Sequence, residues 1–309
     1  MKQSVNLLVI CGPNASGKTH LGVILAQKTG GEIISADSRQ VYRGMDIGTG
    51  KEISEYTTPQ GAVPFHLIDI VEPDEIYTIY HYQKDFYRVF REIQARKKLP
   101  LLVGGTGLYI EAVLKYYRIP NVPENELLRK ELMKKDTRSL LEQLYTFDSA
   151  QVEKTDTSSK KRIVRAIEIA MYAQDHEIEW GCSNPPEIVP LVLGIQWDRQ
   201  KLRQRIDKRL NDRLKEGMID EVGGLMKKGI SSHRFSLFGM EYKFIAQYLT
   251  GKLSYDDMVK GLRNAICQLA KRQETWFRGM ERRGVPVHWI HEADPGEAFK
   301  IIEKHTFIY

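Results

Sequence analysis

Cysteine is scarce in this chain of 309 residues, which contains only Cys11, Cys182 and Cys267. The three lie far apart, they form no Cys-x-x-Cys pair, and their number is odd. Disulfide frameworks and structural zinc sites usually show paired or closely spaced cysteines. The sequence therefore predicts neither kind of site, and we expect each cysteine to be a buried or unreactive thiol.

Long apolar segments are also missing. No run approaches the roughly 20 apolar residues that a membrane-spanning helix needs. The short apolar run at residues 6–11 is followed at once by a glycine-rich motif, with no small-residue cleavage site between them. We interpret it as a buried strand rather than the core of a signal peptide. The expected protein is cytoplasmic and has no membrane association.

Neither sign of charge is in strong excess. The chain has 46 Lys and Arg against 40 Asp and Glu, which gives a net charge of +6 and a pI near 9.0. That balance suits a polyanionic partner such as a nucleic acid, although many basic proteins bind none. The placement of the basic residues therefore matters more than their sum.

Apolar runs that read as strands alternate with segments of helical periodicity in the first third of the chain. Such alternation predicts a parallel sheet with crossover helices. Together with the phosphate-loop motif described below, it predicts a P-loop NTPase-like α/β fold. The helices are expected at residues 19–30 and 80–98. The strands are expected at residues 6–11, 31–38, 66–71 and 99–107.

The character of the sequence changes near Tyr117. From there to residue 189 it is charged, helical in pattern and poor in strand signals, and an apolar run at 188–197 then resembles another strand. We therefore predict a helical insertion domain at 117–189. The core domain would comprise residues 1–116 and 190–309.

A glycine-rich motif, GPNASGKT, lies between the first predicted strand and the first predicted helix. It matches the P-loop pattern GxxxxGK[ST] in full, in the context that distinguishes genuine phosphate loops. Backbone N–H groups of such a loop surround phosphate oxygens at the positive end of the following helix. The lysine adds a cation and the threonine hydroxyl can ligate magnesium. The predicted diphosphate-binding residues are Gly12, Pro13, Asn14, Ala15, Ser16, Gly17, Lys18 and Thr19.

The loop alone leaves the reaction open among nucleotide hydrolysis, kinase chemistry and transfer from another diphosphate ester. Two strands end near an acid, at Asp37 and Asp69, but neither has the four preceding apolar residues typical of a hydrolase. Asp37 falls at the carboxyl edge of the sheet, where it would hold magnesium, act as a general base or simply cap a turn. Thr106, after another strand, faces the same edge unless it belongs to a simple turn.

The ordered motifs GPNASGKT, SADSRQVYRGMDIGTGK, FHLIDI, LLVGGTGLY, KKRIVRAIE and QLAKRQETWFR span residues 12–278. Together they resemble the tRNA dimethylallyltransferase (tRNA isopentenyltransferase) family. The chain ends soon after the last motif, without the zinc-finger extension of eukaryotic relatives, which favours the bacterial type. One departure is the segment SLFGMEYKF, where family members often carry a Gly-Tyr-Lys/Arg string but Met240 and Glu241 here separate the glycine from the tyrosine.

The resemblance implies transfer of the dimethylallyl group from dimethylallyl diphosphate to the exocyclic amine of the adenosine 3′-adjacent to the anticodon, with release of pyrophosphate. The P-loop would then bind the prenyl donor, with magnesium as cofactor near Thr19. Asp37 matches the general base of the family and Arg209 matches an arginine at the diphosphate. Arg205 is the rival for that second role because it shares the same basic helix face. The implied catalytic residues are Asp37, Thr19 and Arg209.

The implied partner is the tRNA anticodon stem-loop, bound by a monomer. A basic helix face at KKRIVRAIE and the interleaved basic and aromatic residues of KRQETWFR suit RNA, although either could be an ordinary exposed face. Trp276 is expected in the core. The implied tRNA-binding residues are Asp37, Ser38, Arg39, Gln40, Thr106, Arg129, Lys161, Arg162, Arg165, Lys271, Arg272, Gln273, Thr275 and Arg278.

Two other functions remain open at this point. An adenylate isopentenyltransferase would prenylate free AMP, ADP or ATP, and the helical insertion and the KRQETWFR motif argue against it. A small-molecule kinase would show magnesium-dependent ATP binding and no prenyl transfer.

Overall fold

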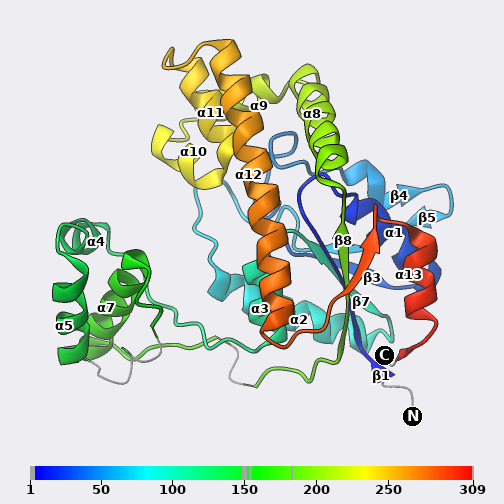
Figure 1. Cartoon of the computed structure of the whole chain (residues 1–309), viewed down its shortest axis with the longest axis horizontal. Coiled ribbons are helices and arrows are strands. Elements are labelled where there is room, and N and C mark those ends of the chain that lie inside the picture. The colour runs from blue at the N-terminus through cyan, green and yellow to red at the C-terminus, as the bar shows by residue number, and fades with distance from the viewer. Residues whose placement is uncertain (1–3, 148–151, 153–154, 182–183, 308–309) are drawn as a thin grey trace. The chain divides into compact units, whose positions relative to one another are not determined.

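The computed structural model describes residues 4–147, 152, 155–181 and 184–307. They form two compact units, each described by itself (Figure 1). The larger unit is built from described residues within Met1–Thr78, Tyr82–Tyr116 and Pro185–Tyr309, and the helical unit from Ile79–His81 and residues within Tyr117–Asn184.

A six-stranded, all-parallel sheet forms the centre of the larger unit, with the order β6-β3-β7-β2-β8-β9. Its middle strands β2 and β7 are buried along their whole length, as their continuous apolar sequences predict. The predicted α/β sheet is therefore confirmed. The strands are β2 (Leu7–Cys11), β3 (Glu32–Ser35), β6 (Phe65–His66), β7 (Pro100–Gly104), β8 (Pro190–Gln196) and β9 (His288–His291).

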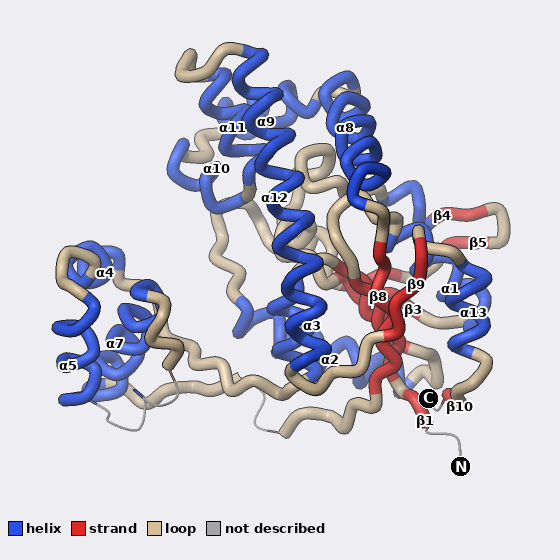
Figure 2. The backbone as a smooth tube through the Cα atoms, in the orientation of Figure 1, coloured by secondary structure: helices blue, strands red, loops and turns tan. Residues whose placement is uncertain are grey.

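Helices flank this sheet (Figure 2). Leu8, Ile10 and Leu101 from the strands share a core cluster with side chains of α1 and α13. The phenol of Tyr82 on α2 donates to the carbonyl of Ser35 at the end of β3. The helices are α1 (Lys18–Thr29), α2 (Ile79–Ala95), α3 (Gly107–Leu114) and α13 (Pro295–Ile302). Short elements complete the unit: β1 (Ser4–Val5), the 3₁₀ helix η1 (Ile53–Tyr56), β4 (Thr57–Thr58), β5 (Gly61–Ala62) and β10 (Thr306–Phe307).

The third predicted strand, at 66–71, is largely wrong. Strand β6 ends at His66 because Leu67 and Asp69 take left-handed backbone conformations, with φ of 62° and 54°. The Asp69 carboxylate instead pairs with the buried amine of Lys51, which also donates to the Asp46 carboxylate at 2.8 Å. Asp69 therefore has a structural role.

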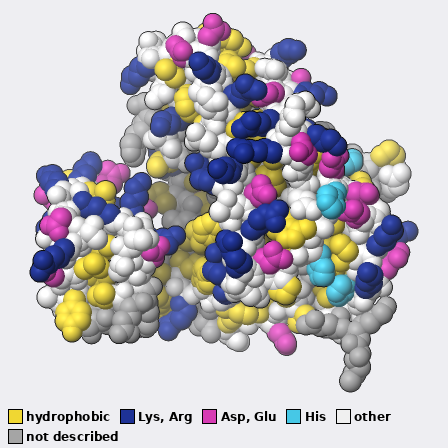
Figure 3. Space-filling view, in the orientation of Figure 1, with side chains coloured by type: hydrophobic (Ala, Val, Ile, Leu, Met, Phe, Trp, Pro, Cys, Tyr) yellow, Lys and Arg dark blue, Asp and Glu magenta, His cyan; other side chains and the backbone are white. Residues whose placement is uncertain are grey.

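The five helices between β8 and β9 pack around a second core that includes Ile206, Met218, Tyr242 and Leu262. Gly217, with φ of 97°, makes the turn between the first two. Lys and Arg side chains gather over these helices on the face shown in Figure 3. They are α8 (Arg199–Lys215), α9 (Met218–Lys227), α10 (Ser232–Phe238), α11 (Met240–Leu249) and α12 (Tyr255–Arg282).

The helical unit contains α4 (Glu126–Leu132), α5 (Thr137–Phe147) and α7 (Lys160–Asp175). Leu140, Leu144 and Ile163 are completely buried in a core of its own. None of the helices within the described ranges is both long and apolar enough to span a membrane.

The prediction of a buried thiol is confirmed for Cys11. Cys11 on β2 is buried, and burial raises the pKa of its thiol to about 12, so the reactive thiolate is suppressed at neutral pH. Cys267 is half-buried and unpaired by a disulfide. Cys182 lies outside the described residues.

Candidate active site

The glycine-rich motif forms a loop between β2 and α1, as predicted. Gly17, with φ of 85°, is the N-cap of α1, and Lys18 is the first residue of the helix. The Lys18 ammonium donates to the carbonyl of Pro13 at 2.7 Å. Burial, together with the neighbouring Arg209, lowers the pKa of Lys18 to about 8. The Ser16 hydroxyl is buried without a hydrogen-bond partner among the described residues.

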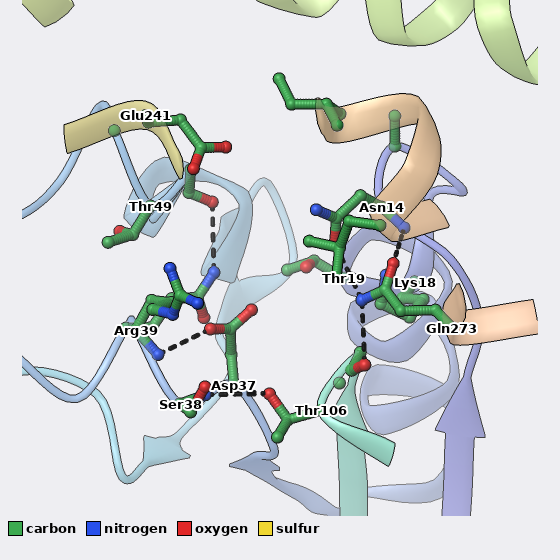
Figure 4. Close-up of a pocket in the computed structure, with 18 of the residues that line it drawn as sticks. Asn14, Lys18, Thr19, Asp37, Ser38, Arg39, Thr49, Thr106, Glu241 and Gln273 are labelled. Carbon is green, nitrogen blue, oxygen red and sulfur yellow. Dashed lines mark hydrogen bonds between the residues drawn. The ribbon is translucent and has the colours of Figure 1, made fainter. Parts of the chain in front are cut away.

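The predicted acid stands beside this loop. Asp37 follows β3, and its Oδ1 accepts the backbone N–H of Arg39 at 2.8 Å. The Thr106 hydroxyl accepts the backbone N–H of Ser38 at 3.0 Å, and the Thr106 N–H donates to the carbonyl of Ala36 at the same distance. The ends of β3 and β7 are thereby tied together, and Thr106 faces the same edge as Asp37 (Figure 4).

A cavity of about 390 Å³ lies at this edge of the sheet. Figure 4 shows side chains from the P-loop, from the segment after β3 and from α12 pointing into it. Both the Thr19 hydroxyl and the Asp37 carboxylate line it, and such hard oxygen donors suit magnesium. The predicted residues brought together here are Asn14, Ala15, Lys18, Thr19, Asp37, Ser38, Arg39, Gln40, Thr106, Arg209, Arg272 and Gln273.

The two rival arginines of α8 occupy different positions. Arg209 lines the cavity, and its guanidinium donates to Oε1 of Glu52 at 2.7 and 3.1 Å. Arg205 lies over the ring of Trp197 and donates to the carbonyl of Ala15 in the P-loop at 2.8 Å. A second cavity of about 480 Å³, on the P-loop side of α8, is lined by both arginines and by residues 15–20. Both arginines therefore lie within reach of an anion at the loop.

A family model described as IPP transferase matches residues 40–280, which is most of the chain. The chain belongs to the IPP transferase family. A second model, described as isopentenyl transferase, matches residues 5–59. The resemblance drawn from the motifs is therefore confirmed.

Full-length relatives agree with this assignment. The chain is 50% identical to tRNA dimethylallyltransferase 1 of Geotalea uraniireducens, covering 94% of this chain and 95% of the relative. It is 47% identical to tRNA dimethylallyltransferase 2 of Shewanella sediminis, covering 93% and 94%. Among solved structures, the tRNA isopentenylpyrophosphate transferase of Bacillus halodurans has a TM-score of 0.69 at 32% identity, with 97% of both chains covered. A eukaryotic dimethylallyltransferase solved acting on tRNA shares the fold, with a TM-score of 0.71 at 23% identity over 95% of this chain and 75% of that one.

Two side chains of α12, Gln273 and Trp276, have surroundings that differ from those expected from the sequence. Gln273, predicted to bind tRNA, has its amide on the P-loop and on the glycine turn after β7. Trp276, predicted in the core, is half-buried and lines the cavity. Lys271, Thr275 and Arg278 are exposed, as a role in binding an external partner requires.

Three of the four predicted tRNA contacts of the helical unit are engaged in ion pairs within it. Arg129 binds both carboxylate oxygens of the buried Glu168 at 2.7 and 3.0 Å, and Arg165 binds the same carboxylate. Arg162 pairs with Asp156 at the surface, and Lys161 is exposed. The sequence indicated a basic helix face but not the buried acid beneath it.

The divergent segment SLFGMEYKF joins α10 to α11 through Gly239, with φ of 137°. Glu241 lines the cavity, and burial raises the pKa of its carboxyl, although Arg213 opposes the shift. Tyr242 is buried and donates to Glu221 at 2.7 Å. No local pattern marks Glu241 as a cavity residue, because only the packing of α11 against α9, α10 and α12 brings it there.

Proposed function

We propose that the protein transfers the dimethylallyl group of dimethylallyl diphosphate to the exocyclic amine of the adenosine 3′-adjacent to the anticodon in tRNA. The observation that carries this proposal is that the P-loop and Asp37 line one cavity in a member of the IPP transferase family. A diphosphate-binding loop and a carboxylate side by side suit alkyl transfer from a diphosphate ester to an amine whose proton the carboxylate accepts.

The donor's diphosphate would bind in the P-loop. Backbone N–H groups at the start of α1, the Lys18 ammonium and the orphaned Ser16 hydroxyl all offer hydrogen bonds to it. Arg205 and Arg209 add positive charge from α8. These groups stabilise the charge that develops on pyrophosphate as the allylic C–O bond breaks.

The acceptor amine would attack the allylic carbon from the side of Asp37. A new N–C bond forms, pyrophosphate leaves with the electron pair of the C–O bond, and the displaced amine proton passes to the Asp37 carboxylate. General-base help of this kind suits a weakly nucleophilic aromatic amine. Magnesium, held at Thr19 with Asp37 close by, would supply further charge neutralisation on the diphosphate.

The anticodon loop would meet the cavity mouth and the exposed basic residues. The target base is stacked in that loop, so it must be turned out to reach Asp37. Ser38, Arg39, Gln40 and Thr106 line the cavity next to the acid, in position to contact the extruded base. Lys271, Thr275 and Arg278 would contact the RNA backbone.

The test is an acceptor comparison. Purified protein, magnesium and dimethylallyl diphosphate are incubated with unmodified tRNAs of adenosine-rich anticodon loops, with AMP, or with ATP alone. Nucleosides are then analysed by mass spectrometry. We expect prenylated adenosine from the position next to the anticodon, and none in tRNA whose adenosine there is replaced by guanosine. Prenylation of AMP but not tRNA would establish an adenylate isopentenyltransferase, and ATP consumption without prenyl transfer would establish a kinase or hydrolase.

A further inference from the structure

One side chain of α12 joins two loops at the catalytic edge of the sheet. Oε1 of Gln273 accepts the backbone N–H of Asn14 at 2.8 Å. Its Nε2 donates to Oδ1 of Asn14 at 3.1 Å and to the carbonyl of Gly105 at 2.9 Å. Figure 4 shows the amide of Gln273 lying against Asn14. The helix is thereby bonded to the P-loop and to the turn after β7.

The geometry of this contact is specific to an amide. A glutamine side chain offers one acceptor oxygen and two N–H donors, and both donor directions and the acceptor are used here. A carboxylate would lose both donor bonds, and an apolar side chain would lose all three. Gly105 also leaves room for it, because a Cβ at that position would lie 2.6 Å from Nε2 of Gln273.

The remainder of α12 is well anchored near this contact. Arg283, just after the helix, binds both carboxylate oxygens of the buried Glu111 on α3 at 2.6 Å. Helix α3 itself begins two residues after Gly105, and the ring of Trp276 on α12 lies against Gly107. Gln273 therefore projects from an anchored helix onto the first half of the P-loop, while Trp197 and Arg205 donate to the carbonyls of Ser16 and Ala15 further along the same loop.

We infer that Gln273 is a positioning residue for the donor: it holds the first half of the P-loop in its diphosphate-binding shape from α12. This inference rests on the proposed function, and it replaces the tRNA contact predicted for Gln273 from the sequence. Without the amide, the Asn14 N–H and the Gly105 carbonyl lose their partners, and the loop becomes free to take other conformations. Part of the binding energy of the diphosphate would then be consumed in ordering the loop.

Donor binding in the absence of tRNA separates this role from an RNA contact. Isothermal titration with magnesium pyrophosphate and, separately, with dimethylallyl diphosphate and magnesium gives the two affinities. For Gln273→Leu we expect both to fall about tenfold, as loss of a few hydrogen bonds to an ordered loop implies. Gln268→Leu is the matched control, because Gln268 is an exposed glutamine on the same helix, and its affinities should equal those of the wild type.

Steady-state kinetics give a second readout. We expect the KM for the donor to rise about tenfold in Gln273→Leu, with kcat at saturating donor and the KM for tRNA within about twofold of wild type. If Gln273→Leu does not unfold cooperatively on heating, Gln273→Met, which keeps the length of the side chain, takes its place in both assays.

Three outcomes would decide the matter. Weakened diphosphate binding with unchanged tRNA binding supports the positioning role. Unchanged diphosphate binding with weakened tRNA binding would show that Gln273 is an RNA contact and overturn the inference. If the wild type itself binds neither pyrophosphate nor dimethylallyl diphosphate, the proposed function fails first, and the inference falls with it.

Discussion

The ammonium of Lys18, which is half-buried in the P-loop, should make donor binding depend on pH between pH 7 and pH 9. Burial lowers the pKa of Lys18 to about 8, so at pH 7 about ten molecules carry the charge for each one that does not. At pH 9 the ratio is inverted. If the diphosphate binds mainly to the charged form, its affinity should fall about tenfold between pH 7 and pH 9, and most of that fall should come above pH 8. Fluorescence or calorimetric titration of dimethylallyl diphosphate from pH 7 to 9.5 measures this slope.

Loss of the fold would not explain such a slope. The folded pKa of Lys18 lies below its unfolded value of 10.5, so between pH 8 and 10.5 the unfolded chain binds the extra proton. The contribution of this group to the free energy of unfolding therefore rises with pH through that window, while donor affinity falls. Glu55 lines the second cavity, and burial together with Glu52 raises its pKa to about 7. It therefore titrates about one pH unit below Lys18, and its effect on donor binding should be complete before the fall above pH 8.

The control for this prediction is Lys18→Met. It should bind donor weakly at every pH and lose the slope above pH 8. An affinity that stays constant from pH 7 to 9.5 in the wild type, or an equal slope in the methionine variant, would refute the assignment of the charge to Lys18.

Three further substitutions have defined expectations. Asp37→Asn should slow prenyl transfer by about 10²- to 10⁴-fold with donor affinity nearly unchanged, and a large loss of affinity in the titration would instead indicate a metal ligand. Arg129→Met removes two bonds to the buried Glu168 and should lower the free energy of unfolding by about 2 kcal/mol in urea, whether or not tRNA is present; no change would mean that Arg165 suffices. Gly107→Ala places a Cβ 2.3 Å from Trp276, so the melting temperature should fall, and an unchanged value would show that the indole moves freely.

Local patterns carried much of the fold. The P-loop and the buried strands β2, β3, β7 and β8 follow from apolar runs, a complete motif and a glycine in the required left-handed conformation, all of which are short-range signals. The strand predicted at 66–71 failed because Leu67 and Asp69 leave the extended conformation to satisfy Lys51, a contact between segments 18 residues apart. Strand β9 was not predicted, since His288–His291 is short and only two of its four residues are apolar.

The site itself was only partly readable. The position of Asp37 and Thr106 at one edge follows from parallel topology, and the structure agrees. Gln273 and Asn14 are 259 residues apart in the chain. No sequence pattern around Gln273 indicates that its side chain contacts the P-loop, whereas its basic neighbours suit RNA. Glu241 enters the cavity through helix packing alone. Side chains whose roles depend on such distant partners have no local signature.

The contacts of Glu221 on α9 limit how the candidate active site could be transferred to another P-loop protein. Its carboxylate accepts the backbone N–H groups of Asp46, Ile47 and Gly48 at 2.8, 2.7 and 3.0 Å, and it also accepts the phenol of Tyr242. The loop that follows Asp37 is thus shaped by a carboxylate from the C-terminal helices. A chimera that joined residues 1–116 to the helices of another P-loop enzyme would keep every N-terminal motif. It would lose the Glu221 carboxylate that binds the backbone of residues 46–48. Residues 1–116 and the helices that follow β8 therefore depend on each other, and a chimera must exchange both together.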